Sequence, residues 1–170
     1  MMKHVIPGAG ILVLVLILVT CPVQAFTAKT LDISIQSNTD AAVSFSYDLT
    51  WYENIVVYSQ IVNPAHELSN AFRSQFGKNV YVTSVSGDQA QFVVENFASG
   101  KVTNGAVILK TPSLSFMDAQ KVLDRYWFAR FVSPDFSPEV TRVSFPDGYS
   151  EVFYNQDYIP SISHTIGSPT

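Results

Sequence analysis

The chain begins with an apolar run, VIPGAGILVLVLILV at residues 5–19, that precedes every acidic residue in the sequence. Lys3 stands just before it, and Ile, Leu and Val make up the whole of residues 11–19. Export machinery recognises such a hydrophobic segment behind a positive charge and directs the downstream chain across the membrane. The run therefore predicts that the rest of the chain folds outside the cytoplasm, in an extracellular or cell-surface location.

The length of this leader fits two fates. A Pro–Gly pair near its start leaves about 15 apolar residues for a continuous helix, where a membrane span needs about 20. Small residues before Phe26 fit cleavage by a signal peptidase. We expect residues 1–25 to be either a cleaved signal peptide or an uncleaved transmembrane helix over residues 5–23 that holds the protein on the membrane. Lipidation at Cys21 is a third alternative, although a threonine precedes the cysteine where Gly, Ala or Ser is usual.

Composition bounds the exported part. The formal net charge of the chain is −4, so a basic surface for nucleic acid is not expected. The single cysteine, Cys21, lies in the leader, and the exported part must therefore be stable without disulfides. About 145 residues come after the leader, which is a usual size for one domain. We predict a single domain over residues 26–158 and an irregular tail over residues 159–170.

Alternating apolar and polar residues predict strands. Such strands are expected at residues 31–35, 43–51, 80–85, 91–97, 106–110, 139–145 and 149–154. Gly87-Asp88 and Pro146-Asp147-Gly148 are typical of tight turns, so the strands on either side of each turn are predicted to form hairpins. Residues 100–105 are expected to form a loop.

Helix signals occur at three places. Asn63-Pro64 can begin a helix that Gly77 ends, and Ser115 can cap another whose apolar side continues to Trp127. A capping-box sequence favours a third helix over residues 51–61, although β-branched residues in that stretch oppose it. The expected fold class is α+β, with an antiparallel sheet of hairpins and two or three helices packed on one of its faces.

Several strings of this sequence resemble those of small exported proteins of unassigned function in methanogen-type archaea. They are LTWYE (residues 49–53), FGKNVYVTS (76–84), KVLDRYWFA (121–129), FSPEVTRVSFPDGYSEVF (136–153) and IPSISHT (159–165). The resemblance covers most of the chain after the leader. It implies an exported protein, and it implies no activity, cofactor or catalytic residue.

Motifs for catalysis or metal binding are scarce. The exported part contains His66 and His164 and no cysteine, whereas zinc needs three or four converging ligands. No G-x-S-x-G or S-x-x-K string marks a nucleophile. Acidic residues near expected turns suit solvated carboxylates: Asp135, Glu139, Asp147 and Glu151. We expect no catalytic residue, no cofactor and no metal ion.

Aromatic residues are concentrated near the C-terminal end, and their spacing is more typical of a core than of a ligand site. Phe128, however, projects about 100° from Trp127 around a helix and cannot share the same buried stripe. A predicted binding face consists of Phe128, Tyr154, Tyr158 and Met117. The leading functional prediction is a non-enzymatic binding or accessory protein whose partner is another envelope protein or a surface glycan. The alternative is a small exported hydrolase whose site has no sequence motif.

Overall fold

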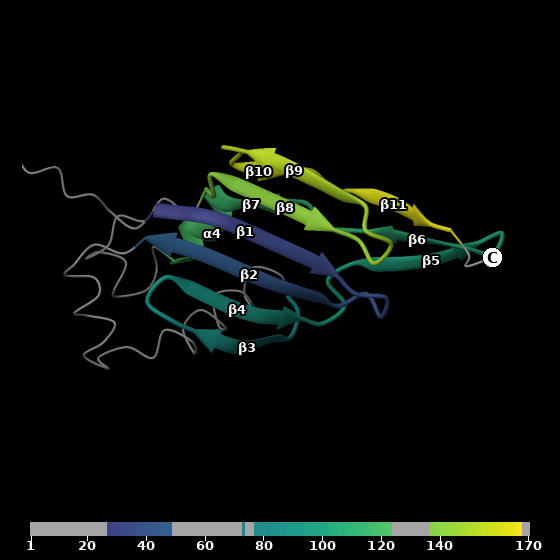
Figure 1. Ribbon diagram of the computed structural model, residues 1–170, viewed down its shortest axis with the longest axis horizontal. Helices are drawn as coiled ribbons and strands as arrows, with labels where there is room; N and C mark the ends of the chain where they lie inside the picture. Colours follow the sequence, from purple (N-terminus) through teal and green to yellow (C-terminus); the bar gives the residue numbers. More distant parts are fainter. Residues whose placement is uncertain (1–26, 49–72, 74–76, 124–136, 168–170) are drawn as a thin grey trace, which may run out of the picture.

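A six-stranded sheet dominates the computed structural model, which describes residues 27–48, 73, 77–123 and 137–167 (Figure 1). In chain order its strands are β1 (Thr27–Ile35), β2 (Ala41–Asp48), β3 (Val80–Val85), β4 (Gln89–Val94), β8 (Val140–Ser144) and β9 (Ser150–Tyr154). Their order across the sheet is β3-β4-β2-β1-β8-β9. Neighbouring strands are antiparallel except β1 and β8, which are parallel.

Tight turns join the strands of this sheet in pairs, and both predicted hairpins are confirmed. The β3–β4 pair turns at residues 86–88, and the β8–β9 pair turns at residues 146–148. In the second turn Gly148 has a φ of 89° and its N–H donates to the Phe145 carbonyl at 3.0 Å. Glycine suits this position because it has no Cβ to oppose a positive φ.

Side chains alternate between the two faces of the sheet, as the period of a strand requires. The inner face carries buried apolar residues from five of the six strands, among them Ile33, Val43, Phe92 and Val143, and β9 contributes the partly buried Phe153. A register shift between Ala28 and Thr30 changes the phase of β1 near its start. From Thr30 onward the odd-numbered residues of β1 face the core and the even-numbered ones face outward.

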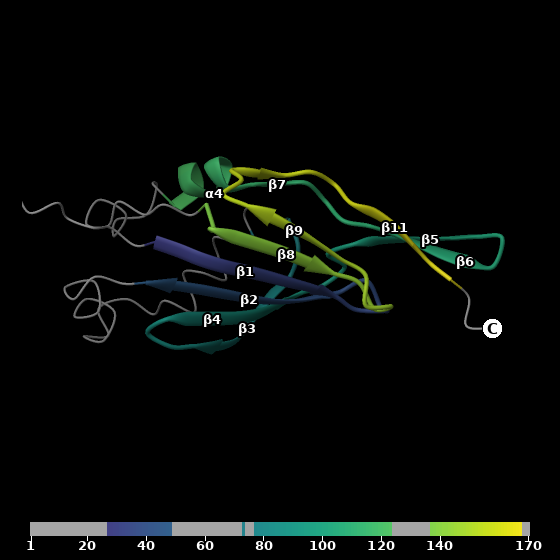
Figure 2. The same ribbon diagram turned by 45° about the horizontal axis from the view of Figure 1, so that its top comes forward.

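A second layer lies on the inner face of the sheet, behind β1, β8 and β9, and buried residues of both layers form one hydrophobic core (Figures 1 and 2). Two antiparallel segments form this layer: β6 (Ala106–Lys110) and β7 (Leu114–Ser115) pair with β11 (Ser163–Ile166) and β10 (Tyr158–Ile159). Pro112 and Pro160 lie in the gap between the two short ladders, where a residue without an N–H is tolerated. Thr111 bridges the gap, because its N–H donates to the Ile162 carbonyl at 2.9 Å.

A three-stranded sheet, called the arm, consists of β5 (Ser99–Thr103), β6 and β11 in the order β11-β6-β5. The arm extends past the end of the six-stranded sheet (Figures 1 and 2). Its β5–β6 turn contains Asn104 and Gly105, with φ of 51° and 80°. These values fit a two-residue type I′ turn, the connection that best matches the twist of a hairpin.

The predicted α+β class is wrong, because the described residues are mostly strand. Their one helix with described bounds is α4 (Phe116–Leu123), and Ser115 caps it as predicted, accepting the Asp118 N–H at 3.2 Å. Gly77 has the left-handed φ of 61° expected where a helix ends, and its N–H donates to the Arg73 carbonyl at 2.8 Å. The helices predicted over residues 51–61 and 64–76 otherwise lie outside the described residues.

Strands replace two segments that were predicted to be irregular. The loop expected at residues 100–105 is β5 and its turn, and the tail expected at residues 159–170 contains β11 and the end of β10. Both segments lack alternation strong enough to indicate a strand. They become strands because β6 and β7 supply backbone partners and because Ile159 and Ile162 are buried in the core.

The prediction of a transmembrane helix also needs correction. Within the part of the chain that the structure describes, no helix is long and apolar enough to cross a membrane. The leader and its predicted cleavage site at residues 1–25 lie outside the described residues.

Candidate functional site

The described members of the predicted binding face are all exposed, but they belong to two layers. Tyr154 is 64% exposed on β9, Tyr158 is 54% exposed on β10, and Met117 is 59% exposed at the start of α4. Tyr154 therefore lies on the six-stranded sheet, whereas Tyr158 and Met117 belong to the second layer and its helix. The fourth member, Phe128, lies outside the described residues.

Tyr154 lies on the outer face of the six-stranded sheet, called the polar face. Strand register brings its side chains into rows that cross all the strands. They are Tyr81 and Ser84 on β3; Gln89, Gln91 and Val93 on β4; Ala42, Ser44 and Ser46 on β2; Thr30, Asp32 and Ser34 on β1; Val140, Arg142 and Ser144 on β8; and Ser150, Val152 and Tyr154 on β9. Ser, Thr and Gln supply more than half of them.

Hydrogen bonds between neighbouring strands order these polar side chains. The hydroxyl groups of Thr30 and Ser46 lie 2.5 Å apart, and the Gln89 amide donates to the Ser44 hydroxyl at 2.9 Å. Each of these groups can form further hydrogen bonds, because a hydroxyl or an amide group can both donate and accept. The polar face thus presents a connected array of donors and acceptors.

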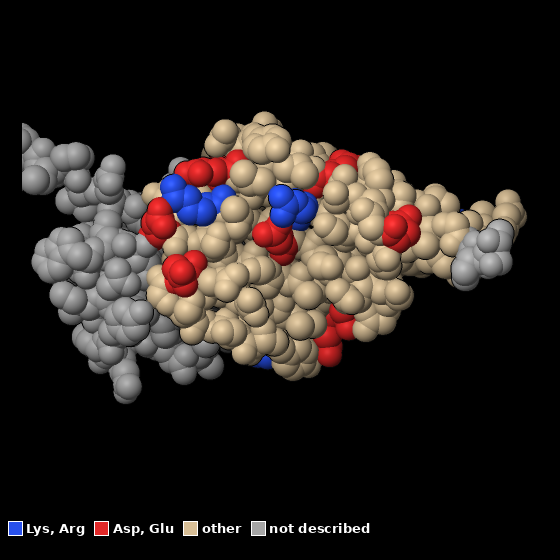
Figure 3. Space-filling view, viewed as in Figure 1, with Lys and Arg blue, Asp and Glu red and all other residues tan. Residues whose placement is uncertain are grey.

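Charge on the polar face is scarce and balanced. Its two charged residues, Arg142 and Asp32, pair at 2.7 Å between the Arg142 guanidinium nitrogen and a carboxylate oxygen. Figure 3 shows this side of the molecule as mostly uncharged: the larger blue groups lie next to red ones, and further red groups stand alone toward the edges. A face of this kind has little net attraction for an ion of either sign.

Exposed tyrosines stand at both edges of the polar face. Tyr81 on β3 is 49% exposed, and Tyr154 is on β9, the strand at the opposite edge. Five inter-strand spacings of about 4.8 Å separate these strands, and strand register places Tyr154 four residues beyond the row of Tyr81. About 24 Å across the sheet and about 14 Å along it therefore put the two tyrosines about 28 Å apart. Each ring offers an apolar surface and a hydroxyl group in the same side chain.

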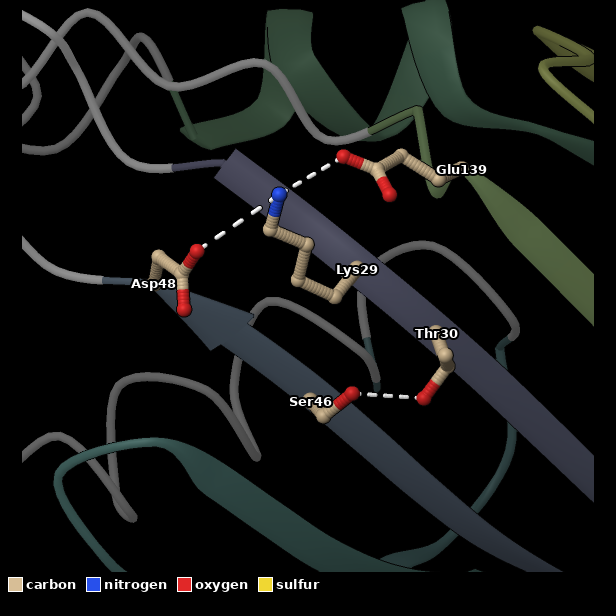
Figure 4. A network of polar contacts seen from close by, with 5 residues as sticks. All are labelled: Lys29, Thr30, Ser46, Asp48 and Glu139. Carbon is tan, nitrogen blue, oxygen red and sulfur yellow. Dashed lines mark hydrogen bonds and ion pairs between the residues drawn. The ribbon is translucent and has the colours of Figure 1, made fainter.

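A lysine bridges three strands at one end of the polar face (Figure 4). The Lys29 ammonium contacts Glu139 at 2.7 Å and Asp48 at 3.5 Å. The hydrogen bond from Lys29 to Glu139, with the charges of both carboxylates, raises the pKa of Lys29 above its ordinary value of 10.5, against a smaller opposing effect of desolvation. Lys29 therefore stays charged and links β1, β2 and the start of β8. Such an exposed group fits a structural link better than a catalytic site.

A second cluster joins the arm to the β8–β9 turn. The His164 Nε2 atom lies 2.7 Å from an Asp147 carboxylate oxygen, and the His164 ring stacks on Tyr149 with centroids 4.2 Å apart and planes 8° from parallel. The hydrogen bond to His164 holds the pKa of Asp147 below its ordinary value. The Tyr149 hydroxyl donates to Glu151 at 2.9 Å, and this hydrogen bond is the main cause that raises the pKa of Tyr149.

This cluster contains two residues that sequence analysis considered for catalysis, Asp147 and His164. A hydrolase of the Ser-His-Asp type also needs a nucleophile within hydrogen-bonding reach of the histidine. Of the residues in the described ranges, those that hydrogen-bond to or stack on the His164 ring are Asp147, Tyr149 and Phe145. None of these is the serine, threonine or cysteine that such a triad requires, and the cluster fits a contact that holds the arm to the sheet.

The rows of the polar face were missed by the sequence analysis, which identified Tyr154 alone among their members. Tyr81 and the serine and glutamine residues occupy outward positions of strands that were predicted to exist, although Gln89 precedes the predicted start of β4 at residue 91. Their arrangement depends on which strands are neighbours, and alternation within a strand carries no information on that. The other histidine considered, His66, and one of the acids, Asp135, lie outside the described residues.

Metal ligands do not gather anywhere in the described ranges, where no group of three or more His, Cys, Asp or Glu side chains could hold an ion. Comparison with protein-family models, curated proteins and solved structures gives no match for this chain. The resemblance to exported archaeal proteins therefore stays a prediction.

Proposed function

We propose that this protein is an extracytoplasmic binding protein and that its polar face holds a neutral polysaccharide. The observation that carries the proposal is an array of hydroxyl and amide groups with exposed tyrosines at both edges. Sugar hydroxyls are donors and acceptors at once, and Ser, Thr and Gln match both roles. The apolar surfaces of Tyr81 and Tyr154 suit the C–H faces of sugar rings.

The charge of the protein favours a neutral glycan over an anionic one. The chain has a formal net charge of −4, and the ion pair of Arg142 with Asp32 leaves the polar face without net charge. A sulfated or uronic-acid polysaccharide would meet repulsion without a compensating basic patch. Export, which the leader predicts, would bring this face into contact with glycans of the cell surface.

The chain offers a matched pair of tyrosines for a test. Tyr154 lies on the polar face, and Tyr158 is exposed to a similar extent on the second layer. Native gels containing dextran, mannan or xylan should retard the protein, and a gel containing alginate should not. Because an aromatic contact contributes about 0.5–1.5 kcal/mol beyond its buried area, Tyr154→Ala should weaken binding about twofold to tenfold. Tyr158→Ala should bind like the unchanged protein.

Two results would contradict this proposal. One is the absence of retardation by all three neutral polysaccharides. The other is equal weakening by Tyr154→Ala and Tyr158→Ala, which would mean that the polar face does not hold the ligand. Circular dichroism spectra of both variants control for changes in fold.

The alternative function, an exported hydrolase, has one supporting observation in the hydrogen bond between Asp147 and His164. The same polysaccharides test it through the release of reducing ends. Release that His164→Gln abolishes, in a variant that keeps its fold, would favour the hydrolase. Binding without release of reducing ends favours the binding protein.

A further inference from the structure

Strand β5 forms an edge of the arm. In the order β11-β6-β5 it has a neighbouring strand on one side only, and all its residues are exposed. Val102 is 72% exposed, more than any other large apolar residue that the structure describes. An edge strand presents a row of N–H and C=O groups with which another extended segment can pair.

Backbone direction identifies which groups of β5 point to this edge. The N–H and C=O groups of successive residues in an antiparallel strand point alternately toward its two sides. Ala98 points away from β6, because its N–H donates to the Thr39 carbonyl at 2.9 Å. Gly100 and Val102 come next at the same alternation and point the same way. The β1–β2 turn thus pairs with the base of this edge, and Val102 lies beyond the reach of that turn.

The two faces of the arm differ in chemistry. Register places Val102 beside Val107 and Ile166 in an apolar row on one face. Lys101 lies on the other face beside Ile108 and Thr165, one strand away from Lys110. The three strands of the arm contain these two lysines and no acidic residue, although the whole chain is acidic. The arm is therefore a locally basic part of a protein with net negative charge.

We propose that β5 receives an extended segment of a partner protein by strand addition and that this segment places an acidic residue opposite Lys101 and apolar residues on either side of it. The backbone groups of Val102 would supply hydrogen bonds, and its side chain would cover an apolar residue of the incoming strand. The lysines of the arm argue against a second copy of the same edge as the occupant, because two basic arms would repel each other.

A lysine on an edge strand commonly prevents pairing, because an incoming strand would cover a charge that has no partner. An acidic residue on the incoming segment would pair with the lysine and so remove this obstacle. A segment without an acidic residue would still bury the unpaired charge. Lys101 would thus select the partner by rejecting strands that lack the complementary charge. This inference does not depend on the polysaccharide proposal, which concerns the polar face.

A charge-exchange experiment tests the proposal with the full-length protein. The probe is the capped pentapeptide Thr-Val-Glu-Val-Thr, whose palindromic sequence allows pairing in either strand direction. Its control has Lys in place of Glu. Peptide-induced NMR shifts should map to β5, and the Glu peptide should bind about fivefold more tightly than the Lys peptide. Lys101→Glu should invert this order. Equal binding of both peptides, or no binding at millimolar concentration, would overturn the proposal.

A pair of substitutions at one position separates backbone pairing from side-chain contact. Val102→Pro removes an N–H that points to the free edge, and it leaves the hydrogen bonds between β5 and β6 in place. It should weaken the Glu peptide about tenfold or more, whereas Val102→Ala, which retains the N–H, should weaken it about threefold or less. Equal weakening by both variants would show contact without strand addition and so refute the mode proposed. Amide spectra would establish that both variants keep the arm folded.

Discussion

Replacing Ile159 by alanine should destabilise the whole two-layered structure. Ile159 is 1% exposed in β10, where it pairs with Leu114 and packs in the core between the two layers. The change removes three carbon atoms, and at about 0.8 kcal/mol for each buried group the lost transfer free energy is about 2.4 kcal/mol. A partly collapsed cavity increases the cost to about 3–4 kcal/mol.

The adjacent residue supplies the control. Tyr158 is the other residue of β10, and its side chain is exposed. Tyr158→Ala should therefore change the free energy of unfolding by no more than about 0.5 kcal/mol. The two variants alter neighbouring positions of one strand and differ mainly in burial, so a difference between them cannot arise from disruption of β10 as such.

Urea unfolding followed by circular dichroism measures both effects. With a slope of about 2 kcal/mol per molar urea, Ile159→Ala should lower the midpoint by about 1.5–2 M in a single transition. A midpoint no lower than that of Tyr158→Ala would refute the assignment of Ile159 to the core. A new early transition, with the main one unmoved, would show that the second layer unfolds separately from the six-stranded sheet.

Three further predictions concern polar and turn residues. The hydrogen bond to His164 holds the pKa of Asp147 below its ordinary value of 3.8, so this contact stabilises the fold above that pH and the stabilisation is lost as pH falls through the lower, folded-state pKa. Below about pH 4, the urea midpoint should therefore fall more steeply with pH for the unchanged protein than for Asp147→Asn. Parallel curves of midpoint against pH would contradict this. Thr111→Val should lower the free energy of unfolding in urea by about 1–3 kcal/mol, because the Ile162 N–H loses the hydroxyl acceptor that lies 2.9 Å away. Thr111→Ser keeps this hydroxyl and should cost less, and equal costs of the two variants would exclude that hydrogen bond as the cause. Asn104 has a φ of 51°, so Asn104→Val should destabilise the fold by about 1–2 kcal/mol and lower the melting temperature, whereas Asn104→Gly should not. Similar melting temperatures of the two variants would contradict the type I′ turn.

Local features of the fold could be predicted from the sequence because their causes are local. The β8–β9 hairpin follows from Pro146-Asp147-Gly148, since proline fixes one φ and glycine accepts the positive one. Ser115 caps α4 because a serine hydroxyl can accept the orphan N–H three residues later. In each case the residues that decide the structure are neighbours in the chain.

Strand pairing over long distances could not be predicted in the same way. Alternation in β1 and β8 indicates two half-buried strands, but it does not indicate that they are parallel neighbours. The ion pair between Lys29 and Glu139 illustrates how far apart in the sequence such neighbours can be, because 110 positions separate the two residues. No turn signal joins them, so the prediction of hairpins alone could not yield the order of the sheet.

The predicted α+β class failed for a related reason. Strand β5 has no buried residue, so its sequence, SGKVT, shows no apolar alternation. It is a strand because the Asn104-Gly105 turn folds it back on β6. The end of the chain looks irregular because of Pro160, yet this proline stands where the second layer has a gap in its ladder. Pro160 therefore does not interrupt the pairing of Ile159 with Leu114, and the Ile159 side chain is buried in the core.

The two proposed binding surfaces depend on different levels of structure. The polar face exists only when six strands take one order, since Tyr81 and Tyr154 come from opposite edges of the sheet. A substitution that weakens the core, such as Ile159→Ala, should therefore reduce polysaccharide binding at urea concentrations that unfold the sheet. The β5 edge needs the arm, which Asn104 and His164 hold through the turn and the contact with Asp147. Asn104→Val should accordingly impair peptide binding more than polysaccharide binding, and the reverse ranking would contradict the separation of the two surfaces.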